Sequence, residues 1–109
     1  MSYDVHLEID TGGPDPAEVC DVGNYTSNCS CMWDHAMGEP HLRDLDGAVA
    51  GEHAERIIAA ARRMEDDPAT YAAMNPPNGW GDSVTAQAYL LKIGKACRAH
   101  PKAVLRVWC

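Results

Sequence analysis

The residues best suited to chemistry in this sequence are a group of thiols and imidazoles in its first third. Cys20, Cys29, Cys31 and His35 fall within sixteen residues. Zinc takes four such ligands in a closed tetrahedron. However, C-x-C is shorter than the usual C-x₂₋₄-C spacing, and Cys31 shares a face with His35 only on a helix. These four are therefore weak metal candidates. We expect no metal and no cofactor, and small buried hydrophobic side chains as their role.

The remaining candidates for catalysis form no convincing set. His53 adjoins Glu52 in a pattern typical of a solvated helix face, and His6 shares the polar side of a strand with Glu8. A cysteine nucleophile needs a base within about 3 Å, and the usual glycine-rich phosphate loops do not occur. We predict that the chain is not an enzyme. A metal-dependent or thiol enzyme is the least supported alternative.

Two polar stretches are better suited to binding than to catalysis. Asn24–Asn28 and Asn75–Asp82 combine amide and hydroxyl side chains with aromatic rings, and each precedes an expected helix start. Helix starts leave backbone amides unpaired, so two starts at one place would form a donor-rich hollow. Tyr25 and Trp80 would wall it, and Asp82 would accept from a hydroxyl or an amine. The predicted ligand-binding residues are Asn24, Tyr25, Thr26, Asn28, Asn78, Trp80 and Asp82.

A purely architectural account of the same stretches is the alternative. In Asn75–Asp82 the two prolines fix φ, and Asn78-Gly79 is a turn pair that tolerates positive φ. On this account Trp80 packs into the core. The asparagine side chains then satisfy one another and only fasten the two loops together.

The elements that must position these residues follow from periodicity. Residues 3–10 alternate polar and apolar over a full strand length. Asn28 is expected to cap a short helix, and Asp46 a long one. The expected elements are strands at 3–10 and 103–109, a strand or extended loop at 19–25, and helices at 29–37, after 46, at 68–74 and at 84–100.

The terminal strands are stable only if they cover each other, so we expect them to pair. The predicted fold is a single α+β domain over residues 1–109. A small two- or three-stranded antiparallel sheet, formed by the terminal strands, packs against three to four helices. A length of 109 residues is enough for one modest core.

The charge distribution bears on partners. Residues 1–55 hold twelve acids and one base, whereas residues 56–109 hold eight bases and four acids, for an overall charge of −7. Duplex nucleic acid is disfavoured because phosphate binding needs a basic face. The two halves either neutralise each other within the fold or form a dipolar surface. Such a surface would steer a host protein or a second copy, so a homo-oligomer is a further expectation.

Compartment and membrane follow from simpler signals. An odd count of five cysteines argues against a disulfide framework. The N-terminus shows no basic-then-apolar leader, and no segment approaches the roughly 20 apolar residues that cross a bilayer. We therefore expect a cytoplasmic protein without a membrane partner.

Five short motifs together resemble a group of small proteins from actinobacterial phages. They are G-N-Y-T-S-N at 23–28, Met32-Trp33, Leu45-Asp46-Gly47, M-N-P-P-N-G-W-G at 74–81 and A-C-R-A-H-P at 96–101. The resemblance covers most of residues 20–107. It implies an accessory phage protein in the host cytoplasm rather than a housekeeping enzyme, and it carries no activity with it. The C-S-C at 29–31 does not belong to the pattern.

The sequence thus predicts a non-enzymatic, phage-type accessory protein. Its partner would be a small polar or nucleotide-like ligand, and its role would be in counter-defence. One alternative is a modulator that binds a host protein through a charged surface. A second is a minor virion-associated or metal-binding protein.

Overall fold

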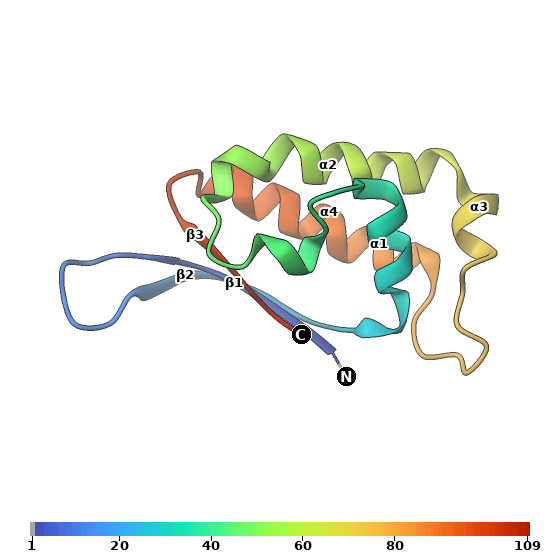
Figure 1. Cartoon of the computed structure of the whole chain (residues 1–109), viewed down its shortest axis with the longest axis horizontal. Coiled ribbons are helices and arrows are strands. Elements are labelled where there is room, and N and C mark those ends of the chain that lie inside the picture. Colours follow the sequence, from blue (N-terminus) through green and yellow to red (C-terminus); the bar gives the residue numbers. More distant parts are fainter. Residues whose placement is uncertain (1) are drawn as a thin grey trace.

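The computed structural model describes residues 2–109, which form an α+β fold with a three-stranded antiparallel sheet and helices on one of its faces (Figure 1). The strands are β1 (Ser2–Ile9), β2 (Ala17–Thr26) and β3 (Val104–Trp108), in the order β2-β1-β3. The predicted pairing of the terminal strands is confirmed: Val5 lies opposite Val107, and Leu7 opposite Leu105. The N-terminal strand is therefore the centre of the sheet.

Alternation along β1 explains how the sheet presents one face to the helices. Tyr3, Val5 and Leu7 are buried, while Asp4 and its polar neighbours lie on the opposite face. Successive strand residues point to opposite faces, so apolar residues two apart bury together. Ile9 continues the inward row but is 39% exposed, because the helices do not cover that end of the strand.

Residues 2–109 contain four α-helices on the inner side of the sheet. They are α1 (Ser30–Met37), α2 (Ala50–Asp66), α3 (Pro68–Ala72) and α4 (Ser83–Ala99), with 3-10 turns η1 (Ser27–Cys29) and η2 (Leu42–Leu45). Of these, α3 lies beyond the strands and packs against α2 and α4. α2 and α4 cross closely at Gly94, where an added Cβ would lie 2.6 Å from the Ile58 side chain. Glycine permits this approach because it has no side chain.

A cluster of tryptophan and tyrosine side chains fills part of the core, in a sequence that contains no phenylalanine. Trp33 is fully buried, and its ring centroid lies 5.0 Å from that of Tyr3 and 5.8 Å from that of Tyr89. These separations are typical of favourable aromatic pairs. The indole N–H donates to the carbonyl oxygen of Ala86 at 3.0 Å. The one polar atom of this buried side chain is thus satisfied, and α1 is joined to α4.

Two predicted helix caps are wrong. Thr26, not Asn28, caps the turn before α1, because its Oγ1 accepts from the Asn28 N–H at 3.3 Å. The long helix α2 begins only at Ala50, with no side-chain cap. Asp46 instead accepts from the Val107 N–H at 3.0 Å and from Arg106 at 2.8 Å. These bonds, that of Val107 above all, lower the pKa of the Asp46 carboxyl.

The central place of β1 makes the last strand indispensable. Removal of residues 104–109 would expose one edge of β1 and delete the buried Leu105 and Val107. We expect the truncated protein to show no cooperative melting transition by circular dichroism. Trp108→Ala is the control: its side chain is 57% exposed, so the variant should melt within a few degrees of the native protein. A truncated protein with an unchanged transition would contradict this topology.

Candidate functional site

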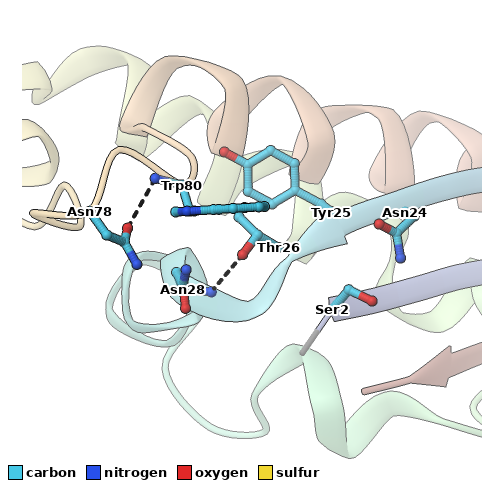
Figure 2. Close-up of a pocket in the computed structure, with 7 residues that line it drawn as sticks. All are labelled: Ser2, Asn24, Tyr25, Thr26, Asn28, Asn78 and Trp80. Carbon is cyan, nitrogen blue, oxygen red and sulfur yellow. Dashed lines mark hydrogen bonds between the residues drawn. The ribbon is translucent and has the colours of Figure 1, made fainter.

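The two polar stretches meet at one hollow. A cavity of about 580 Å³ is lined by Ser2, Asn24, Tyr25, Thr26, Asn28, Asn78 and Trp80. Its walls come from the start of β1, the end of β2 with the following turn, and the 75–82 loop (Figure 2). Six of the seven residues predicted from the sequence therefore lie around the same space. Ser2 was missed. The pairing of the strands places it opposite Thr26, and only that register could have indicated it.

The Tyr25 hydroxyl holds the 75–82 loop against the sheet. It lies 2.7 Å from Thr85 Oγ1, accepts from the Asp82 N–H at 3.2 Å, and lies 3.2 Å from the Asp82 carbonyl oxygen. Burial raises the pKa of this phenol, so it keeps its proton at neutral pH and remains a donor. One strand residue thus satisfies both the loop and the first turn of α4.

Gly81 brings the loop into direct contact with β2. Its φ is +92°, a conformation that glycine adopts without penalty. A Cβ at this position would lie 2.8 Å from Thr26 Cγ2 and 2.9 Å from both the Cys29 sulfur and the Tyr25 hydroxyl. The backbone therefore passes where no other residue fits.

Bonds within the loop fix its shape. Asn78 Oδ1 accepts from the Trp80 N–H at 3.0 Å, and Asn75 Oδ1 accepts from the Ser83 N–H at 2.8 Å. The Asn78 bond, to the backbone two residues on, is a turn that asparagine side chains commonly form. The loop is thus shaped by its own asparagines and held in place by Tyr25.

Trp80 does not pack into the core as the architectural account required. Its side chain is 67% exposed and forms one wall of the cavity. Figure 2 shows the Trp80 indole in the hollow, between Asn78 and Tyr25. A large ring that remains exposed in a rigid loop offers a flat apolar surface for stacking.

Amide groups around the cavity remain available for a ligand. The side chain of Asn28 makes no hydrogen bond to any residue between 2 and 109, and the same holds for Nδ2 of Asn78. Asn24 donates through Nδ2 to Asp4 at 3.1 Å, which leaves its oxygen free within that range. The expected mutual pairing of these asparagines is therefore not what joins the loops.

Asp82 does not line the cavity. Its Oδ1 accepts from the Thr85 N–H at 2.8 Å and from Thr85 Oγ1 at 3.2 Å, so the carboxylate caps α4. The cap itself agrees with the sequence pattern. Its consequence is that the carboxylate turns toward the helix rather than toward the hollow, and the expected role as an acceptor for a ligand does not fit this geometry.

The side chains that line the cavity are neutral, and acidic residues lie behind its wall. All seven lining side chains are neutral. Two carboxylate residues stand directly behind the wall: Asp4 bonds to Asn24, and Asp82 bonds through its backbone to Tyr25. Such surroundings disfavour a bound phosphate, because like charges repel. They accept a neutral or a positively charged group.

The thiols and the imidazole considered for a metal do not come together. Cys29 is buried, with its sulfur 3.8 Å from the Tyr25 hydroxyl, whereas Cys31 is exposed. The His35 ring packs edge-on against Tyr71 at 5.6 Å, and Cys20 is half-buried on β2. Within residues 2–109, no three His, Cys, Asp or Glu side chains are grouped so as to hold a metal ion.

Comparison with known proteins adds no relative. The chain matches no protein-family model, and no curated protein or solved structure is significantly similar to it. Across residues 2–109, no helix combines the length and the apolar character needed to cross a bilayer.

Gly81→Ala tests the close approach of the loop. The new methyl would meet three atoms of β2 and the following turn, and φ would be strained. We expect a loss of about 3 kcal/mol in the free energy of unfolding, from strain and overpacking together. The matched control is Gly79→Ala, which has a φ of +75° but open space around it. It should lose only about 1 kcal/mol. Equal losses in urea melts would show that the contact contributes nothing.

Thiol labelling tests the burial of the cysteines. Burial raises the pKa of Cys29, and that of Cys97 to about 11. At pH 8 both should stay protonated and unreactive toward a disulfide reagent until the protein unfolds. Cys31 and Cys109 are exposed and should react at once.

Elemental analysis of the purified protein should find less than one zinc ion per chain. A stoichiometric zinc that is lost in Cys29→Ser would contradict this.

Proposed function

We propose that this protein is a non-enzymatic accessory protein of the phage type that binds a small, flat, polar ligand in the cavity beside Trp80. The supporting observation is one exposed indole next to the Asn28 side chain and Asn78 Nδ2, which form no hydrogen bond within residues 2–109. Ligand pockets combine apolar surface with a few convergent polar groups, and about 580 Å³ is an ordinary size for them.

A nucleobase or nucleoside suits the site best within this class. Its ring would stack on Trp80, and its edge donors and acceptors would pair with Asn24, Asn28 and Asn78. Base stacking on an aromatic side chain is worth about 1–3 kcal/mol. The neutral lining supports a base rather than a phosphate as the buried part. In a nucleotide the phosphate would remain in solvent.

A role in counter-defence follows as part of this proposal. The resemblance to phage proteins supports an accessory role in the infected host, with the host cytoplasm as its location. A protein that binds a nucleotide-like molecule without converting it acts by sequestration, which requires affinity and abundance rather than turnover. The 75–82 loop, made rigid by its two prolines, supports sequestration, because a site that is already formed loses little entropy on binding.

Trp80→Ala tests the site directly. Binding of adenosine, guanosine, cytidine and thymidine is measured in turn by isothermal titration calorimetry, and in the native protein also by tryptophan fluorescence. We expect at least one to quench Trp80, and Trp80→Ala to weaken its binding roughly tenfold or more, as the loss of one stacking contact requires. Asn28→Ala should weaken binding and leave the melting temperature unchanged, because its side chain supports no other residue in the range 2–109.

Trp108→Ala is the matched control, since it removes another exposed indole outside the cavity. Its affinity should equal that of the native protein. The proposal fails if no nucleoside binds at millimolar concentration, or if Trp80→Ala binds as well as the native protein. A 5′-monophosphate that binds much more tightly than its nucleoside would contradict the assignment of a neutral site.

A further inference from the structure

The β1–β2 hairpin forms an arm that extends beyond the rest of the molecule. Figure 1 shows the connection between the two strands at the left, past the ends of the helices. Residues 9–16 are all exposed, and the molecule measures 46 × 26 × 19 Å. We call residues 9–18 the arm. Ile9 lies on the side of the arm that would face a helix, yet it is 39% exposed.

The arm carries negative charge that nothing in the described chain neutralises. Asp10, Asp15 and Glu18 are exposed, and none of them forms an ion pair with any residue from 2 to 109. The arm contains no base. Three carboxylates without an ion pair, on an exposed hairpin, form an acidic surface that is complementary to a positively charged partner.

A basic surface lies along the outer side of α4 and the turn that follows it. Lys92, Lys95 and Arg98 are exposed at three-residue spacing on α4, so they share a helix face. Lys102 is also exposed and lies in the turn after the helix. We call these four the stripe. Its one ion pair among residues 2–109 is a long contact of 4.0 Å between Arg98 and Glu55.

The arm and the stripe lie toward the same end of the molecule. The turn from α4 into β3 is at the left in Figure 1, and so is the arm. The 75–82 loop, which walls the cavity, is at the right. A contact at the arm end would therefore leave the cavity open.

We propose that a second copy of the chain occupies this end, so that the arm of each copy lies along the α4 stripe of the other. The two surfaces are complementary in charge, and within residues 2–109 their one ion pair is the long contact between Arg98 and Glu55. Their common end allows a single two-fold axis to make both contacts at once. Such a reciprocal interface closes on itself rather than growing into a chain. It would also cover the exposed Ile9. Charge complementarity of this kind fixes orientation and partner choice.

The dimer is measured by sedimentation velocity and light scattering in about 50 mM and about 500 mM salt. Because exposed charges are screened at the higher salt, the dissociation constant should rise roughly tenfold or more. The arm variant is Asp15→Lys with Glu18→Lys, and the stripe variant is Lys92→Glu with Lys95→Glu and Lys102→Glu. None of these five side chains forms a hydrogen bond or ion pair within residues 2–109, so both variants should fold normally.

Each variant alone should be monomeric, because its arm and stripe then carry the same sign. Mixed in equal amounts, the two should form a one-to-one heterodimer, because each arm again meets a stripe of opposite sign. The matched control is Glu65→Lys with Asp66→Lys. It changes the net charge as the arm variant does, but at the far end of α2, and it should dimerise normally.

Three results would overturn the proposal: a native protein that stays monomeric at about 100 µM in low salt, variants that still dimerise alone, or a mixture that stays monomeric. The dimer does not depend on the cavity. Nucleoside binding by the arm and stripe variants should equal that of the native protein, so either proposal can fail without the other.

Discussion

The hydroxyl of Tyr25 is the contact on which the arrangement of the binding site depends. It joins the end of β2 to the 75–82 loop and to the first turn of α4, through Asp82 and Thr85. Gly81 allows the loop backbone to come this close. Because the inner part of the loop is held against the strand, the neighbouring Trp80 must point outward. The cavity is thus a product of loop docking.

The layout of the fold was readable from the sequence because it is encoded in local pattern. Periodicity predicted the strands at 3–10 and 103–109, and it predicted a helix after the Asn75–Asp82 stretch, where α4 begins. Asp46 shows the limit of local pattern. Its short side chain fits a helix cap, but Arg106 and Val107, sixty residues away, bind it more effectively. A cap is predictable only when no distant donor competes for it.

The composition of the site was more predictable than its orientation. Asn24–Asn28 and Asn75–Asp82 were placed together because both adjoin helix starts, and six of the predicted residues do line one cavity. Whether Trp80 faced the core or the solvent depended on the close approach of the Gly81 backbone to Tyr25, Thr26 and Cys29 of another segment. Likewise, Ser2 enters the wall only through its register with Thr26. Such long-range contacts leave no local signal in a single sequence.

The central position of β1 also has a consequence for how the protein is made. β1 leaves the ribosome long before β3, one of its two neighbours in the sheet. The elements synthesised between them must therefore wait with one side of β1 unpaired. Contacts between residues so far apart in the sequence also slow folding, since a long loop must close before they form. Until β3 emerges, the nascent chain exposes an open strand edge of the kind that leads to aggregation and that chaperones shield.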